Sequence, residues 1–415
     1  MRCLSIFLIV LLISSCEKEE VVSLRTDAEG VVVDMPYLWT SPLSDGELIP
    51  GGIRPSLTWN EYVLFGGYSD GQQVLYMKHS KDGSTLWQWN DHLSEGEELD
   101  VRDYHQYENY LAVSQGSRAY GIDLATGSTL WRKQTNTDLG ALVKGAGNRY
   151  FLSEEITNSD GHLEAIATVG DILTGQQYEL IRPPYTYEYI NPLNRISSLH
   201  SLELFIEFTG DTSMIMTYGN ELPDWRNDNF LGLYNLTQQR WIYTNKSITK
   251  NSIFGAGTLT LSKDQDKVYL QAGKKLFCYE IATGEKRWEQ TFAQGFSDII
   301  VAENKLLANS EDTYLYALDL GTGRQVWKEK SSGTSSPMAY LNGVVYFTGG
   351  GDGLLHAIEV ATGKHLWKIQ SPDLESNSGA WFKRHVAVLA PANEGEKGKV
   401  LTSSYLSAFC YEAAR

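Results

Sequence analysis

Short stretches of alternating apolar and polar residues, separated by turn residues, recur along most of the chain. The stretch 314–318 alternates in this way, a turn containing Gly323 follows it, and a second short stretch holds Trp327. Side chains of a β-strand point alternately to its two faces, and glycine adopts the positive φ that tight turns require. The pattern therefore predicts β-hairpins.

The hairpin repeats with a fixed offset between its turn and an aromatic residue. In four copies an acidic residue, a Thr and a Gly precede a Trp that lies four residues after the Gly, and weaker copies lie between them. Successive aromatic positions are 39 to 63 residues apart, and a further strand pair precedes each hairpin. Four strands in about 40 to 50 residues are typical of a β-propeller blade. The seven aromatic positions are Trp87, Trp131, Tyr178, Trp241, Trp288, Trp327 and Trp367.

The two ends of the chain predict how the ring closes. After Trp367 we expect strands at 380–382, 385–389 and 405–411, but no final turn with a Trp. Near the start, residues 37–43 form a lone strand with nothing before it to pair with. We therefore predict an all-β, eight-bladed propeller of four-stranded antiparallel blades over residues 37–415. The N-terminal strand closes the last blade and removes the exposed sheet edges.

The core Ala317-Leu318-Asp319 through Trp327 resembles the quinoprotein-like (PQQ-like) repeat family, and the resemblance covers about residues 37–412. It implies that one Trp per blade docks against the neighbouring blade, where its burial stabilises the ring. The docking residues expected on this basis are Trp39, Trp87, Trp131, Trp241, Trp288, Trp327 and Trp367.

The N-terminal segment predicts export and a lipid anchor. Residues 1–15 contain an apolar run over 4–13 that is too short to span a bilayer and is typical of a signal peptide. The order Ile13-Ser14-Ser15-Cys16 resembles a bacterial lipobox, which implies lipidation of Cys16. The alternative is an ordinary signal peptide that leaves Cys16 free. We expect residues 16–36 to form the lipidated Cys and a flexible tether. The resemblance favours the outer membrane and leaves open whether the anchor lies on the periplasmic face or at the cell surface.

Charge and residue usage argue against two classes of function. The 51 acidic and 35 basic residues give a net charge of −16, which disfavours nucleic-acid binding. Quinone-dependent dehydrogenases share the repeat, and the resemblance would require an adjacent Cys-Cys pair and a calcium-binding acid and amide set. Cys278 and Cys410 instead take the place of Ala in other repeats, and the eight His residues show no ligand spacing. We therefore predict no catalytic residue, no metal and no cofactor.

One interval departs from the repeat and predicts a binding surface. The 63 residues between Tyr178 and Trp241 contain two irregular stretches, at 182–189 and 209–228. Links between blades and loops between second and third strands emerge on the same face of a propeller, so the two stretches can meet. Tyr and Trp are enriched at protein-contact hot spots, although these side chains can also pack on their own loops. The expected partner-binding residues are Tyr185, Tyr187, Tyr189, Tyr218 and Trp225.

In its length, its lipobox and its lack of quinone ligands, the sequence is most similar to the BamB-type propeller lipoproteins of outer-membrane β-barrel assembly. This resemblance implies a non-catalytic, outer-membrane-anchored scaffold that binds an envelope protein and meets the membrane only through its lipid. A surface lipoprotein that binds glycan or peptide through the same face is the alternative. A third hypothesis for the function is a quinone-dependent dehydrogenase.

Overall fold

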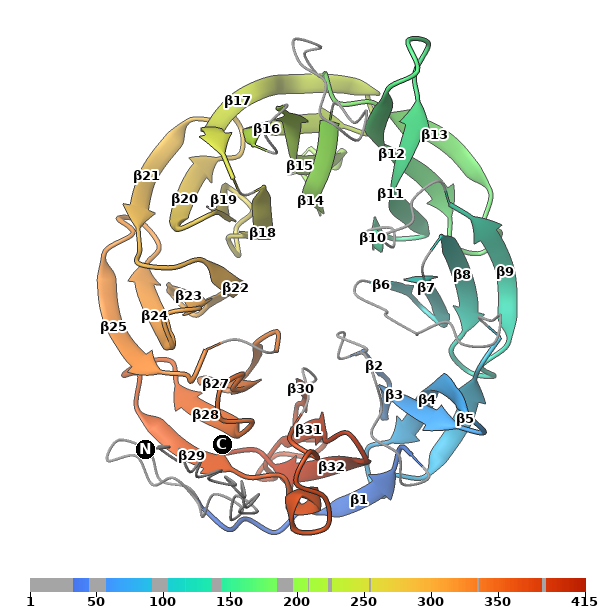
Figure 1. Cartoon of the computed structure of the whole chain (residues 1–415), viewed down its shortest axis with the longest axis vertical. Helices are drawn as coiled ribbons and strands as arrows, with labels where there is room; N and C mark the ends of the chain where they lie inside the picture. Colours follow the sequence, from blue (N-terminus) through green and yellow to red (C-terminus); the bar gives the residue numbers. More distant parts are fainter. Residues whose placement is uncertain are drawn as a thin grey trace, which may run out of the picture.

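Eight four-stranded antiparallel sheets stand around a common axis like the blades of a propeller (Figure 1). The computed structural model describes residues 33–44, 57–91, 104–115, 117–135, 143–184, 197–207, 209–222, 226–253, 255–333, 336–382 and 386–415. Over these residues the predicted all-β, eight-bladed architecture is confirmed. No helix in this part of the chain is long and apolar enough to cross a membrane.

Each blade runs from an inner first strand to an outer fourth strand, as Figure 1 shows. Blade one contains β2 (Thr58–Trp59), β3 (Tyr62–Ser69), β4 (Gln72–His79) and β5 (Thr85–Trp89), and blade two contains β6 (Tyr104–Tyr107), β7 (Tyr110–Gln115), β8 (Arg118–Asp123) and β9 (Thr129–Gln134). Blade three contains β10 (Val143–Ala146), β11 (Arg149–Thr157), β12 (Leu163–Asp171) and β13 (Gln177–Ile181), and blade four contains β14 (Ser197–Ile206), β15 (Thr212–Glu221), β16 (Asn227–Asn235) and β17 (Arg240–Ser252). Blade five contains β18 (Ala256–Leu261), β19 (Lys267–Ala272), β20 (Lys275–Glu280) and β21 (Lys286–Thr291), and blade six contains β22 (Phe296–Ala302), β23 (Lys305–Ser310), β24 (Tyr314–Asp319) and β25 (Gln325–Lys330). Blade seven contains β26 (Ala339–Leu341), β27 (Val344–Thr348), β28 (Leu355–Glu359) and β29 (His365–Ile369), and blade eight contains β30 (Val386–Leu389), β31 (Lys399–Ser403), β32 (Ser407–Glu412) and β1 (Trp39–Pro42).

The ring closes as predicted, with the first strand of the chain completing the last blade. β1 pairs antiparallel with β32, and Trp39 lies opposite Cys410. The pairing extends beyond the strand, because the Leu38 N–H donates to the Cys410 carbonyl at 2.7 Å and the Leu43 N–H to the Leu406 carbonyl at 2.8 Å. This closure covers the β32 edge, which would otherwise present unpaired backbone groups.

Two details at the ends differ from the sequence-based expectation. Residues 380–382 are not a strand, and the middle of blade eight is instead built from β31, which the hydrophobic pattern did not indicate. Residues 33–36, expected within the tether, already contact the propeller. The Val33 N–H donates to the Lys368 carbonyl at 2.9 Å, and Met35 packs against the core of blades seven and eight.

The hydrophobic core is divided into clusters, each lying between two neighbouring blades. Leu64 and Leu75 of blade one pack with Leu111 of blade two, for example, and equivalent clusters follow around the ring to blades eight and one. Side chains on both faces of a blade are therefore buried, as in any stack of sheets. Stability consequently depends on the fit between blades.

A Trp on the outer strand of one blade joins it to the hairpin turn of the next. The Trp87 indole N–H donates to the Leu124 carbonyl at 2.7 Å, and the ring lies flat against Gly127, whose φ is 72°. A Cβ at Gly127 would lie 2.8 Å from the ring, so glycine serves both the turn and the contact. The same bond joins Trp39 to Ser80, Trp131 to Ile172, Trp288 to Leu320 and Trp327 to Val360.

Trp241 and Trp367 depart from this arrangement. Trp241 packs on Tyr218 and Tyr234 of its own blade, and the turn glycine of blade five, Gly284, is covered instead by Tyr243 and Lys246. Trp241 is therefore not a docking residue of the expected kind. Trp367 lies in the core between blades seven and eight, but no described residue accepts a hydrogen bond from its indole N–H.

Candidate functional site

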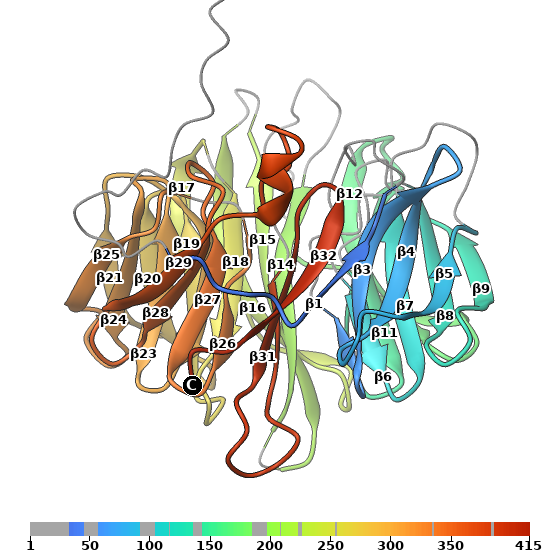
Figure 2. The same cartoon turned by 90° about the horizontal axis from the view of Figure 1, so that it is seen from below.

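We call the face that carries the second-to-third-strand turns and the links between blades the loop face. It is marked by the short 3-10 helix η1 (Pro372–Glu375), which follows the outer strand of blade seven and lies at the top of Figure 2. Within η1, Leu374 is buried and Asp373 accepts a hydrogen bond from Ser404. This acidic residue of the loop face is therefore held inside the fold.

Most of the predicted functional residues lie outside the part of the chain that the structure describes. These residues are Cys16, Tyr185, Tyr187, Tyr189 and Trp225. In the sequence, residues 182–196 link blades three and four and residues 222–226 link β15 to β16, and the described residues that flank both segments lie on the loop face.

Tyr218 does not belong to a contact surface. It lies in β15 with its side chain 0% exposed, and its hydroxyl donates to Asn245 Oδ1 at 3.1 Å and accepts from the Asn245 N–H at 2.8 Å. Burial raises the pKa of Tyr218 to about 12. The sequence predicts an irregular stretch over 209–228, but residues 212–221 and 227–228 of it belong to β15 and β16, which pair up to Glu221 and Asn227. Alternate residues of these strands face the core, which is why Tyr218 is buried.

The described residues next to these two segments are anchored. Arg182, which follows β13, places Nε 3.1 Å from Oε2 of the buried Glu164. Across blade four, the Leu222 N–H donates to the Arg226 carbonyl at 2.7 Å and closes the base of the β15–β16 connection. Both loop segments therefore begin from fixed positions on the same face.

The loop face is hollowed between blades five and six. A cavity of about 330 Å³ is lined by the backbone of four glycines and by Gln271, Lys274, Gln294, Phe296 and Glu311. The Gln271 side chain lies across Gly257, and no described group forms a hydrogen bond with its buried Oε1 atom. An amide, a cation and a carboxylate around an apolar floor are suited to a polar, hydrogen-bonding ligand.

A second cavity, of about 430 Å³, lies on the same face between blades two and three. Its lining is mostly polar and includes Ser117, Thr135 and Glu155. The Thr135 N–H donates to the Ser117 carbonyl at 2.7 Å, so this wall is built from the turn of blade two and the link that leaves it. The face thus offers two separate concave sites.

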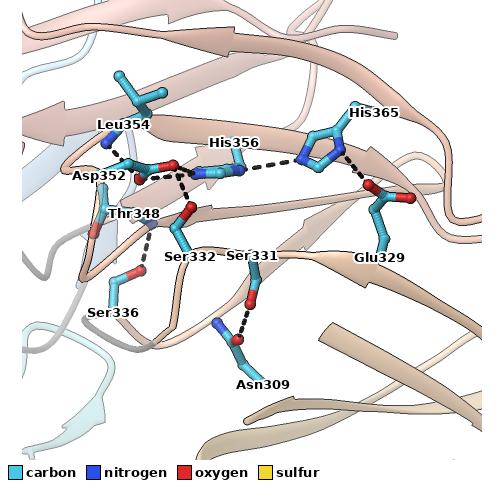
Figure 3. A network of polar contacts seen from close by, with 10 residues as sticks. All are labelled: Asn309, Glu329, Ser331, Ser332, Ser336, Thr348, Asp352, Leu354, His356 and His365. Atoms are coloured by element: carbon cyan, nitrogen blue, oxygen red, sulfur yellow. Dashed lines mark hydrogen bonds and ion pairs between the residues drawn. The ribbon is translucent and has the colours of Figure 1, made fainter. Parts of the chain in front are cut away.

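A buried chain of four ionisable side chains runs from the loop face into the ring between blades six and seven (Figure 3). The Asp352 carboxylate lies 3.2 Å from His356 Nε2, His356 Nδ1 lies 3.2 Å from His365 Nε2, and His365 Nδ1 lies 3.2 Å from Glu329 Oε1. Both imidazoles are buried, with His356 at 0% exposed. The spacing of the histidines in the sequence did not indicate this contact. It arises because His356 and His365 lie on the paired strands β28 and β29.

The surroundings shift the pKa values of this chain. Burial by itself raises the pKa of the Asp352 carboxyl, but hydrogen bonds from His356, Ser332 and the Leu354 N–H, with the charge on His356, bring the pKa below its usual value. For His365, burial is the largest cause and the charges of His356 and Lys368 add to it, so its pKa falls to about 3. Asp352 is therefore ionised at neutral pH, and two full positive charges on the histidine pair are disfavoured.

Neither described cysteine is a nucleophile at neutral pH. Cys278 and Cys410 are free and buried in different blades. Burial raises the pKa of each thiol to about 12, so the thiolate that would react is scarce. Within the described ranges, no three His, Cys, Asp or Glu side chains gather closely enough to hold a metal ion.

Comparison with known protein families supports the resemblance seen in the repeats. The family described as outer membrane protein assembly factor BamB matches residues 225–415, the part of the chain with most of the clear repeats. The resemblance to BamB-type propellers of the quinoprotein-like repeat is thereby confirmed over these residues. No curated protein matches the sequence.

Solved structures share the fold at low sequence identity. BamB from Moraxella catarrhalis superposes with a TM-score of 0.59 at 12% identity, covering 92% of this chain and 100% of its own. Saccharomyces cerevisiae Sqt1 gives a TM-score of 0.66 at 13% identity, covering 92% and 100%. The computationally designed protein Ika8 gives 0.59 at 14% identity, covering 93% and 99%. At these identities the likeness shows the propeller fold alone.

Proposed function

We propose that this chain is a non-catalytic protein-binding scaffold, held at the outer membrane by a lipid on Cys16, that presents its loop face to an envelope protein. The observation that carries the proposal is the closed eight-bladed ring together with the match of residues 225–415 to a family described as an outer-membrane protein assembly factor. A rigid ring holds loops in fixed relative positions, and such loops are suited to binding.

The loop face also offers the features expected of a contact surface. Two cavities open on it, and Tyr185, Tyr187 and Tyr189 belong to the sequence that links blades three and four. Aromatic side chains at the centre of an interface contribute most to affinity when a concave surface surrounds them. We therefore expect the partner to cover blades two to six.

Crosslinking in cells tests the proposal. Mild crosslinking, isolation of outer membranes and affinity purification are expected to recover one envelope protein with the wild-type chain. The double variant Tyr187→Ala and Trp225→Ala should lose most of that recovery. Tyr178→Ala is the matched control, because Tyr178 is 53% exposed on the outer strand of blade three and lies off the loop face.

Three results would contradict parts of the proposal. Recovery of no partner argues against a scaffold, and equal recovery with the double variant argues against the loop face. A chain found wholly outside the membrane fraction argues against the anchor.

Binding of a glycan or short peptide is a second candidate, favoured by the cavity between blades five and six, where no described group forms a hydrogen bond with Gln271 Oε1. A wild-type chain that binds an oligosaccharide or peptide library, with binding lost in Lys274→Ala, would support this candidate. Protease treatment of intact cells then determines whether the chain lies at the surface.

A further inference from the structure

Asp352, His356, His365 and Glu329 form a row in which three pairs of polar atoms face each other. Each pair leaves a gap that one proton must bridge. Two of them join a ring nitrogen to a carboxylate oxygen at 3.2 Å, and the third joins His356 Nδ1 to His365 Nε2 at 3.2 Å. A nitrogen lone pair that faced a carboxylate, or another nitrogen lone pair, at this distance would be repelled. Every gap therefore holds one N–H or O–H.

Counting protons shows that neutral histidines cannot fill these gaps. Two neutral imidazoles carry one N–H each, and two ionised carboxylates carry none, so two protons would be available for three gaps. The third proton lies either on the histidine pair, which it makes a single shared cation, or on the Glu329 carboxyl. This count does not depend on which atom holds the proton at a given moment.

The charges that face the pair agree with the count. Asp352 from the β27–β28 turn and Glu329 from β25 contribute two negative charges, and Lys368 on β29, which is 2% exposed, contributes one positive charge. Among these three charges, one shared proton brings the sum to zero, whereas its loss would leave a net negative charge beside the buried rings. Phe347 stacks on His356 at a ring-centroid distance of 4.8 Å, and such a site disfavours an uncompensated charge.

The row of four side chains also links blade six to the loop-face turn of blade seven. Glu329 belongs to the outer strand of blade six, and Asp352 holds the β27–β28 turn of blade seven on the loop face by accepting from the Leu354 N–H at 3.1 Å. The Ser332 hydroxyl, in the link that leaves blade six, donates to the same carboxylate at 2.6 Å. A change in protonation would therefore alter the contact between the blades and the turn.

We propose that His356 and His365 share one extra proton at neutral pH and act as a pH-sensitive latch between blade six and the loop-face turn of blade seven. The proposal does not rest on the function suggested above. It concerns residues that take no part in the proposed contact surface.

The sign of the pH dependence follows from the proton counts. An unfolded histidine has a pKa of about 6.5, so above this pH the unfolded chain holds fewer protons than the latched fold, and raising the pH destabilises the fold. Below this pH the unfolded histidines take up two protons, while the buried pair resists the second one. Stability contributed by the latch should thus be greatest near neutral pH and fall on both sides.

Nitrogen NMR on the wild-type chain with 15N-labelled histidine gives a direct test. At neutral pH we expect N–H signals from His356 Nε2 and His365 Nδ1 and a third, strongly downfield proton between the rings. Only two protonated nitrogens on the pair, with neither carboxyl protonated, would overturn the proposal. So would a stoichiometric metal ion detected by elemental analysis of the purified chain, because a metal would then fill the gap between Nδ1 and Nε2.

Variants extend the test to stability. His356→Gln and His365→Gln are expected to flatten the fall in melting temperature between pH 7 and pH 9 and to release about one proton fewer on unfolding. His79→Gln is the control, since His79 also lies near two carboxylates, 3.5 Å from Glu61 and 3.8 Å from Asp82, but has no histidine partner. A wild-type slope in all three variants would exclude the latch. The NMR count remains decisive if either buried variant fails to fold.

Discussion

A Trp indole between two blades contributes apolar area and, separately, a hydrogen-bond donor. Trp327 uses both, since its N–H reaches the Val360 carbonyl at 3.0 Å. Trp367 uses only the first, because among the described residues its buried N–H meets no acceptor. The difference arises in blade eight, whose two outer strands, β32 and β1, come from distant parts of the chain and are not joined by a hairpin turn.

This contrast predicts unequal effects of the same substitution. Trp327→Phe should destabilise the protein by about 1–2 kcal/mol more than Trp367→Phe, because only the first leaves a buried carbonyl without its donor. Both variants lose similar ring area, so the difference isolates the hydrogen bond. Thermal unfolding of the two variants side by side measures it, and equal losses would show that the indole bond contributes nothing.

Residue identity alone does not report whether an aromatic side chain is buried. The Trp positions follow from a fixed offset to a turn, so the sequence locates them. Tyr218 has no such marker, and its burial depends on the register of β15 against β14 and β16. The link between His356 and His365 could have been suspected only from their positions on the two strands of one predicted hairpin.

At the scale of single elements, the hairpin turn is the most regular unit of the fold. Gly127 combines a φ of 72° with close contact to Trp87, whereas Gly71 has a φ of 76° and no described residue within 4 Å of the position its Cβ would take. The two turns therefore separate the conformational requirement for glycine from the packing requirement.

Alanine at these two glycines should give different losses of stability. Gly71→Ala is expected to cost about 1–2 kcal/mol, from backbone strain alone. Gly127→Ala should cost about 1–3 kcal/mol more, since its Cβ would displace the Trp87 ring. Urea unfolding of both variants provides the measurement, and an equal cost would mean that the ring moves aside freely.

Blade four departs from the repeat in its long outer strand and in the residues that replace a docking Trp. Its outer strand β17 has 13 residues and several register shifts against β16, and Tyr243 and Lys246 take the place of a docking Trp. The turn before β17 lacks glycine and uses Gln239 at a φ of 52°. The missing glycine was visible in the sequence, but the lengths of the four strands were not, because polar residues interrupt their alternation.

At the scale of the whole molecule, stability depends on closing the circle. Each core cluster needs both of its blades, so an open ring would expose two blade faces and one strand edge. Strand number and closure could be predicted because each repeat carries its own turn and Trp. The β31 strand was missed because the short stretch Lys399–Ser403 follows a run of glycine and charged residues and lacks a paired turn signal.

Removing the closing strand tests this dependence. A chain that begins at Ser44 lacks β1 and should melt at a markedly lower temperature than a chain that begins at Val33, and it should form oligomers through the exposed β32 edge. Light scattering at increasing protein concentration would detect the oligomers. Equal melting temperatures and a monomer in both cases would mean that β1 is dispensable.

The order in which the chain is made gives this closure a further meaning. Of the strands that the structure describes, β1 is synthesised first, yet its partner β32 is synthesised last. Pairing of such distant segments carries a high loop entropy until the intervening blades have formed. A ribosome that stops short of β32 would therefore release a chain whose first strand has no partner, however well its middle blades have folded.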